Sequence, residues 1–187
     1  GVPVHQLLGG RCRDGLTAYA HASGDDIEGT LAAAASLMEQ SYRAVRLQSA
    51  VPGQRNTYGV PQAEAALHST RGRPSEELWD TAAYLRHVPE LFRRAREELG
   101  PQVQLLHDAH HRLTPNEAGR LGWQLEPYHL YWLEDPVPAE QQRSYRAIRQ
   151  HTTIPLAVGE VFNSVHDCSQ LIEEELTSAI GAAKHER

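Results

Sequence analysis

From Leu16 onward the chain alternates short β-prone runs with longer helical stretches, and this order restricts the possible folds more than any other feature. Strands that alternate with helices indicate βα units and a parallel sheet. Five strands are predicted, at residues 16–20, 43–49, 103–109, 129–135 and 154–160. Helices are predicted near residues 25–40, 80–99 and 139–150, after residue 114, and from about residue 166. The sequence therefore predicts an α/β fold.

Capping residues support two of these helices. Asp25 or Asp26 is available to cap the helix near residues 25–40. The helix that follows the third strand is announced by a threonine cap, a proline at the first helical position and an acid in the first turn, namely Thr114, Pro115 and Glu117.

Three acidic residues recur in step with the predicted strands. Glu134 lies 134 − 108 = 26 residues after Asp108, and Glu160 lies 160 − 134 = 26 residues after Glu134. Each stands where a predicted strand gives way to its loop, and such positions meet at one end of a parallel β/α barrel. Crowded carboxylates repel one another unless a cation neutralises them, and an all-oxygen set suits magnesium better than zinc. The sequence predicts a magnesium site; helix-capping or solvated loop acids are the alternative.

The alternation of side chains along a strand extends this prediction. Asp108 and His110 are two residues apart and are expected to face the same side, whereas His107 and His111 face away. His110 is therefore a candidate proton donor beside the metal, with a structural role as the alternative. Asp135 follows Glu134 directly, must point the other way, and is expected to be a loop or capping group.

Arg46 and Tyr58 form the second candidate pair. Arg46 stands between Val45 and Leu47 in the second strand, so it needs an interior partner or an aqueous pocket unless it forms a surface salt bridge. Tyr58 lies in the long polar segment 51–80, and structureless loops of that length are usually functional lids. A nearby guanidinium lowers the pKa of a tyrosine, so Arg46 could make Tyr58 a base; a packing role for Tyr58 is the alternative.

Composition restricts the partners of this chain. With 40% apolar residues, 22% charged residues and a net charge of -6, its 187 residues resemble an ordinary globular domain. Arginine and glutamate are interspersed, without the basic stripe of a nucleic-acid surface, so small-molecule partners are expected. No apolar run approaches a membrane span and no secretory signal opens the chain, so a cytoplasmic protein is predicted. Cys12 and Cys168 are expected to be free thiols.

Several ordered segments together resemble the D-mannonate dehydratase group of the enolase superfamily, which comprises mandelate racemase-like acid-sugar dehydratases. They are PVHQLLGG at 3–10, AVRLQSAVPG at 44–53, YGV at 58–60, LLHDAHHRLTPNEA at 105–118, LEPYHLYWLEDPVPAE at 125–140 and RQHTTIPLAVGEVFN at 149–163. The resemblance implies a (β/α) barrel of the enolase-superfamily type, the TIM-barrel architecture. It also implies a hydro-lyase of carbohydrate metabolism that converts D-mannonate, or D-gluconate, to 2-keto-3-deoxy-gluconate.

The resemblance also implies roles for individual residues. It makes Asp108, Glu134 and Glu160 the ligands of Mg²⁺, as their spacing suggests independently. It makes Tyr58, assisted by Arg46, the base that removes the proton next to the sugar-acid carboxylate. His110 becomes the acid that helps the 3-hydroxyl leave as water. His21 matches a substrate-contacting histidine, and Arg46, His110 and Glu160 also belong to the implied substrate-binding set.

The chain departs from the family pattern in its extent. Only about the first five βα units are expected, without the capping domain: residues 1–15 as a junction, 16–180 as a partial barrel and 181–187 as a tail. The tail SAIGAAKHER is not expected to form a sixth strand. The alternatives are a truncated or non-catalytic family member that keeps the metal ligands, and an acid-sugar enzyme of different stereochemistry. A sugar acid is the expected ligand, and a homo-oligomer the expected assembly.

Overall fold

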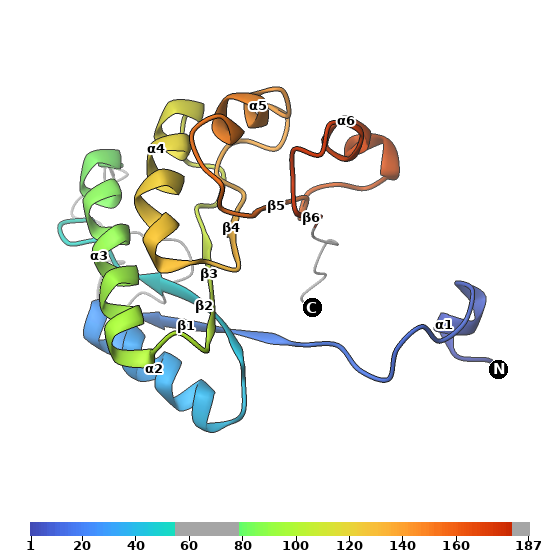
Figure 1. Ribbon diagram of the computed structural model, residues 1–187, viewed down its shortest axis with the longest axis horizontal. Coiled ribbons are helices and arrows are strands. Elements are labelled where there is room, and N and C mark those ends of the chain that lie inside the picture. Colours follow the sequence, from blue (N-terminus) through green and yellow to red (C-terminus); the bar gives the residue numbers. More distant parts are fainter. Residues whose placement is uncertain (55–78, 181–187) are drawn as a thin grey trace, which may run out of the picture.

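Six parallel strands form one sheet in the computed structural model, which describes residues 1–54 and 79–180 (Figure 1). The strands pair in chain order, each with the next, so a simple run of βα units builds the sheet. They are β1 (Tyr19–Gly24), β2 (Ala44–Ser49), β3 (Gln104–Asp108), β4 (Trp132–Glu134), β5 (Leu156–Val158) and β6 (Ala179–Ile180). The predicted α/β class is confirmed.

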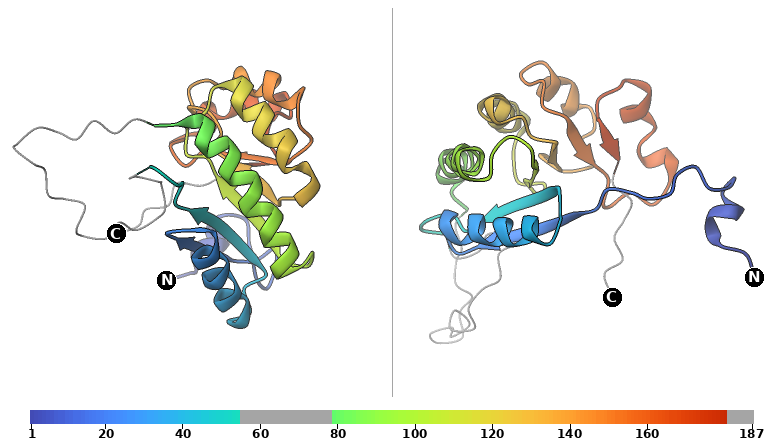
Figure 2. Two further views of the ribbon diagram at one scale, coloured as in Figure 1. Left: turned by 90° about the vertical axis from the view of Figure 1, so that its left-hand side faces the viewer. Right: turned by 60° about the horizontal axis from the view of Figure 1, so that its bottom comes forward.

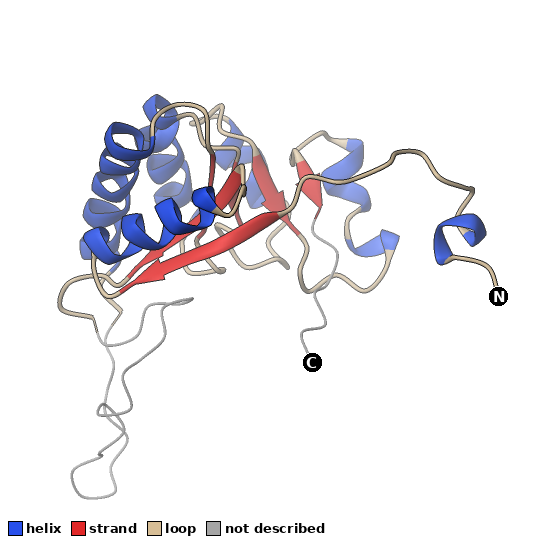
Figure 3. Cartoon of the chain, turned by 90° about the horizontal axis from the view of Figure 1, so that it is seen from below, coloured by secondary structure: helices blue, strands red, loops and turns tan. Residues whose placement is uncertain are grey.

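Helices connect the strands and cover the sheet. They are α1 (Val4–Leu7), α2 (Ile27–Glu39), α3 (Thr81–Leu99), α4 (Pro115–Leu125), α5 (Ser144–Arg149) and α6 (Ser169–Glu173), with short 3₁₀ turns η3 (Glu126–Tyr128) and η4 (Val165–Asp167). Helices α2, α3 and α4 lie side by side on the outside of the sheet (Figures 2 and 3). The short helix α1 lies apart from the sheet, at the end of an extended segment (Figure 1).

The predicted helix starts are confirmed by their caps. The Asp26 carboxylate accepts a hydrogen bond from the Gly29 amide at 2.7 Å at the start of α2. At the start of α4, Thr114 and Glu117 form a reciprocal capping box, and Pro115 occupies the first turn. Such caps satisfy amide groups that a helix end leaves without partners.

β4 and β5, at three residues each, are shorter than predicted, and β1 and β6 also differ from their predictions. β1 extends to Gly24, beyond the predicted end at residue 20, because Tyr19 to Gly24 pair in register with β2. A Cβ at Gly24 would lie 2.4 Å from the Thr30 amide nitrogen, so the glycine lets α2 begin close to the strand. The prediction that the tail lacks a sixth strand is wrong, because Ala179 and Ile180 pair with Ala157 and Val158 of β5. Two residues carry too little pattern for a strand to be recognised in sequence.

The core lies between the sheet and its outer helices. Every residue of β2 is buried, and so are Phe92 of α3, Leu121 of α4 and Tyr145 of α5. His107 of β3 also belongs to this layer. Its ring lies 2.7 Å (Nε2) from the Tyr84 hydroxyl and 3.0 Å (Nδ1) from the Leu47 carbonyl oxygen. His107 therefore faces away from the site end of the sheet, as the strand alternation predicts.

This burial makes His107 a source of acid sensitivity. Burial lowers the pKa of His107 to about 4, from a usual 6.5. In the unfolded chain the ring protonates near pH 6.5, so the stability that the neutral ring contributes falls as pH drops from 6.5 through 4. We expect His107→Gln, which cannot titrate, to remove roughly 3 kcal/mol of this pH dependence. Urea unfolding of parent and variant at pH 7, 5.5 and 4 measures it, and parallel pH profiles would contradict it.

Candidate metal and active site

The carboxylates predicted from their spacing are delivered to one end of the sheet. Asp108 and Glu134 end β3 and β4 and are register partners on these neighbouring strands. Glu160 lies two residues beyond the end of β5, after Gly159, whose φ of 124° is a left-handed conformation that favours glycine. All three residues therefore stand at the carboxyl ends of adjacent parallel strands, where sites in such folds are built.

Arg46 reaches this end of the sheet from β2. Its Nη1 donates to Asp108 Oδ2 at 2.9 Å, and the two side chains are only 7% and 1% exposed. Its Nη2 lies 3.1 Å from His21 Nδ1 on β1, the register partner of Arg46. The interior partner expected for Arg46 is thus Asp108, and the alternative of a surface salt bridge is excluded. Arg46, Asp108 and His21 form one polar chain across three strands, in which Arg46 and Asp108 are buried and His21 is exposed.

The pKa of Asp108 reflects its burial and the negative charges beside it. Burial raises the pKa of this carboxyl to about 7; Arg46 opposes the rise, and the negative charges of Glu134 and Glu160 add to it. The Asp108 carboxylate accepts from the His110 amide at 2.8 Å, and its backbone oxygen accepts from Gln48 Nε2 at 2.8 Å. The carboxylate is therefore held in a fixed position, where a bound cation would stabilise its ionised form.

The two histidines after Asp108 do not continue the strand. His110 and His111 have φ values of 50° and 61°, so the chain turns through left-handed conformations. His110 stays beside the site, with Nε2 3.6 Å from Glu160 Oε1, as predicted. The prediction that His111 faces away is wrong, because the turn brings its Nε2 to 3.3 Å from the same oxygen. Burial lowers the pKa of His110, which eases release of its proton.

Asp135 corrects a second sequence prediction. Asp135 lies in the loop after β4, as predicted, but it is buried (1% exposed) and caps nothing, since neither carboxylate oxygen has a hydrogen-bond partner among the described residues. β4 ends at Glu134, and Asp135 directly after it has a φ of 39°. Its Oδ2 lies 3.7 Å from His111 Nε2. Burial raises the pKa of Asp135 to about 7, and His111 counteracts this.

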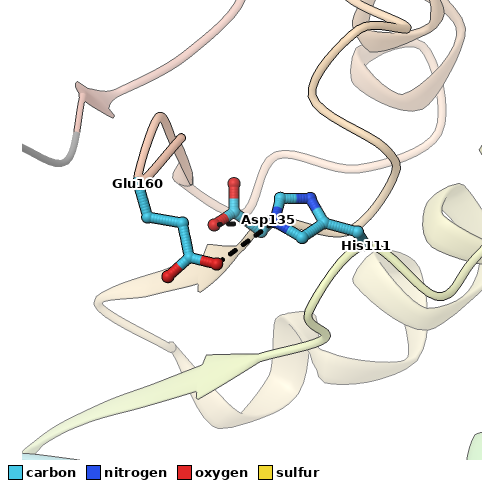
Figure 4. Close-up of side chains that lie close together, drawn as sticks. All are labelled: His111, Asp135 and Glu160. Atoms are coloured by element: carbon cyan, nitrogen blue, oxygen red, sulfur yellow. Dashed lines mark hydrogen bonds and ion pairs between the residues drawn. The ribbon is translucent and has the colours of Figure 1, made fainter. Parts of the chain in front are cut away.

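Within the described part of the chain, one group of possible metal ligands is drawn together closely. The nearest ligand atoms of His111, Asp135 and Glu160 all lie within 4.8 Å of one another (Figure 4). The predicted trio shares only Glu160 with this group, because Asp108 engages Arg46 and Glu134 accepts from Trp132 Nε1 at 3.1 Å. The donor set around Glu160 is nevertheless rich in carboxylate oxygen and crowded with negative charge, which fits a hard divalent cation such as magnesium.

The remaining predicted site residue, Tyr58, lies outside the described residues, as does most of the segment expected to form a lid. Its pairing with Arg46 stays a prediction. Sequence reasoning missed Asp135 and His111, although both stand directly beside predicted site residues. For Asp135 the available signal is Pro136, which has no amide hydrogen to donate to a strand ladder and so marks the end of the strand.

Comparison with known protein families identifies the family of this chain. The model of the enolase C-terminal domain-like family matches residues 30–183, most of the chain. The chain belongs to this family, and thus to the enolase superfamily. Its six-stranded parallel sheet is consistent with a partial barrel of that superfamily.

Curated members of the superfamily resemble the chain over almost its whole length. It is 56% identical over 183 residues to a D-mannonate dehydratase of Caulobacter sp. (strain K31). The matched region makes up 97% of this chain and 45% of the relative. It is 51% identical over 175 residues to a D-galactonate dehydratase family member of Cellvibrio japonicus, with 93% and 44% covered. The chain thus spans about half the length of the curated relatives it matches.

Solved structures agree with this assignment. A crystal structure of an enolase from Pantoea ananatis with bound D-gluconate and magnesium superposes with a TM-score of 0.83 at 35% identity. The superposition covers 97% of this chain and 46% of that one. A putative dehydratase from Mesorhizobium loti, 22% identical with a TM-score of 0.75, covers 97% of this chain and 44% of that chain, and shares the fold.

None of the helices in the described ranges is long and apolar enough to cross a bilayer.

Proposed function

We propose that this chain carries the metal-binding half of the active site of a magnesium-dependent sugar-acid dehydratase. The substrate would be D-mannonate or D-gluconate, and the products 2-keto-3-deoxy-gluconate and water. The observation that carries the proposal is the meeting of Arg46, Asp108, Glu134, His110 and Glu160 at one end of a parallel sheet. Relatives named as dehydratases, and a neighbour holding D-gluconate and magnesium, support it.

Asp108, Glu134 and Glu160 would hold the ion. When bound, magnesium supplies positive charge that stabilises the charge developing on the substrate carboxylate. The buried Arg46 guanidinium adds a second fixed positive charge at the same place and orients His21 beside it. Arg46 and His21, together with His110, would bind the sugar acid.

The two proton transfers fall to different side chains. Tyr58, assisted by Arg46, would take the proton from the carbon next to the carboxylate. His110 would give its Nε2 proton to the 3-hydroxyl, which then leaves as water. The resulting enol rearranges to the 2-keto acid, so the reaction removes one water from the sugar acid and needs no oxidant or reductant.

The test is to incubate the folded protein with magnesium and D-mannonate, and separately with D-gluconate, and to assay for the keto-deoxy acid. Formation of this product, abolished by Glu134→Gln, is expected. Calorimetric magnesium binding without turnover on a panel of sugar acids would favour the alternative of a non-catalytic family member. This alternative rests on the chain covering 45% of its dehydratase relative. A folded protein that neither binds magnesium nor turns over would contradict both.

A further inference from the structure

Glu160 is the least constrained of the proposed ligands. Asp108 and Glu134 end strands of the sheet, whereas Glu160 follows Gly159 on the loop after β5. Its side chain is 37% exposed, against 1% for that of Asp108. A ligand on a loop needs neighbours that hold its carboxylate in place, since metal sites depend on such supporting contacts for ligand orientation.

His111 is the neighbour that contacts Glu160 most closely, and its own ring is fixed. Its Nδ1 lies 3.2 Å from the Val137 carbonyl oxygen, which can only accept, so Nδ1 carries a hydrogen and donates. This contact orients Nε2 toward Glu160 Oε1, 3.3 Å away, and because a carboxylate oxygen also only accepts, Nε2 is the donor of this second bond. Because both ring nitrogens have partners, the imidazole is held in one orientation.

The backbone around His111 reinforces this orientation. The His111 amide donates to the Asp135 carbonyl oxygen at 2.7 Å, and the Leu113 amide donates to the Pro136 carbonyl oxygen at 3.1 Å. The loop after β3 is therefore attached to the loop after β4. The His111 ring is carried on a rigid junction of two loops and reaches a third loop, the one that bears Glu160.

Asp135 is the third member of the group. Its carboxylate is buried, has no hydrogen-bond partner among the described residues, and faces His111 Nε2 at 3.7 Å (Figure 4). A buried carboxylate in this position is costly unless it serves a neighbouring positive group. The side chain that it serves is His111, whose Nε2 contacts both Asp135 Oδ2 and Glu160 Oε1.

We propose that Asp135 and His111 are a positioning pair: Asp135 fixes the His111 imidazole, and His111 holds the Glu160 carboxylate where it can join Asp108 and Glu134 around one ion. Neither residue contacts the ion in this arrangement. The inference deepens the proposed function and rests on it, because it takes Glu160 as a ligand.

The first test is divalent-ion affinity, measured by calorimetric titration of metal-free protein with Mg²⁺ and, separately, with Mn²⁺. His111→Gln and Asp135→Asn are each expected to weaken binding of both ions by a similar factor, roughly 10–100-fold. The matched control His166→Gln, in the exposed turn η4, should leave both affinities unchanged. Unchanged affinities in the His111 and Asp135 variants would overturn the proposal. A loss much larger for Mn²⁺ than for Mg²⁺ would also overturn it, because it would make His111 a direct ligand.

The second test asks whether His111 acts through Glu160. In a Glu160→Gln background, His111→Gln is expected to cause no further loss of ion affinity, whereas two independent roles would give additive losses. If the parent protein binds neither ion, the proposed function fails, and the positioning pair is judged without metal. In that case the ring ¹⁵N signals of His111 in the metal-free protein should shift on Glu160→Gln and on Asp135→Asn. Signals that stay in place would refute the pair.

Discussion

The His110→Asn variant should lose dehydration turnover by roughly 10²–10⁴-fold, the usual contribution of a positioned general acid. His110 Nε2 points to the Glu160 side of the site, and its backbone amide binds Asp108, a contact that asparagine keeps. The loss should therefore fall on kcat, with little change in ion affinity. Keto-acid formation, followed under saturating substrate, measures it.

A second readout separates acid from base. If Tyr58 removes the proton next to the carboxylate, the His110→Asn variant should still exchange that proton for deuterium from solvent, seen by NMR of the recovered substrate. A control variant, His151→Asn, changes an exposed histidine beside Gly119 and should be fully active. Exchange that vanishes together with turnover would assign His110 to proton abstraction instead, and undiminished turnover would remove it from the mechanism.

Breaking the buried pair between Arg46 and Asp108 is expected to produce the largest change in stability. Arg46→Met should lower the free energy of unfolding by roughly 3–5 kcal/mol, because it leaves Asp108 buried without its positive partner. The double variant Arg46→Met/Asp108→Asn should recover part of that loss, since both charges are then gone. Urea unfolding of the four proteins in this cycle, without added metal, gives the coupling between the two residues.

The exposed pair between Arg93 and Glu90 on α3 provides the matched control. Its side chains are 43% and 46% exposed, and water already solvates both charges. Arg93→Met should therefore cost less than about 1 kcal/mol. Equal losses for Arg46→Met and Arg93→Met would show that Asp108 does not depend on Arg46.

The sequence was most informative where the pattern was regular. The period of strand and helix gave the parallel α/β architecture, and the caps at Asp26 and Thr114 gave the helix starts. The orientation of His107 also followed from alternation along a strand, whereas for Arg46 the sequence left an interior role and a surface salt bridge as alternatives. In each case a local pattern, helix capping or strand alternation, agrees with the tertiary structure. The environment of the residue could therefore be predicted from its neighbours in sequence.

The errors occurred where backbone conformation changes at the end of a strand. Alternation assigned His111 to the wrong side because it assumes extended geometry, whereas His111 has a φ of 61°. The burial of Asp135, whose φ is 39°, was not predicted either. β6 was missed because its two residues depend on pairing with β5, a long-range contact that leaves no periodicity. Which carboxylates gather most closely also depends on such turns, so the grouping of Asp135 and His111 with Glu160 required coordinates.

The pairing order of the sheet has a consequence for whatever completes the site. Among the described strands, β1 and β6 each have a partner on one flank only. Any further strand that joins either flank in the same parallel sense delivers its C-terminal residue to the rim that already holds Asp108, Glu134 and Glu160. The strand that closes the sheet would then also supply a wall of the site. Its C-terminal residues would line the pocket proposed for the sugar acid.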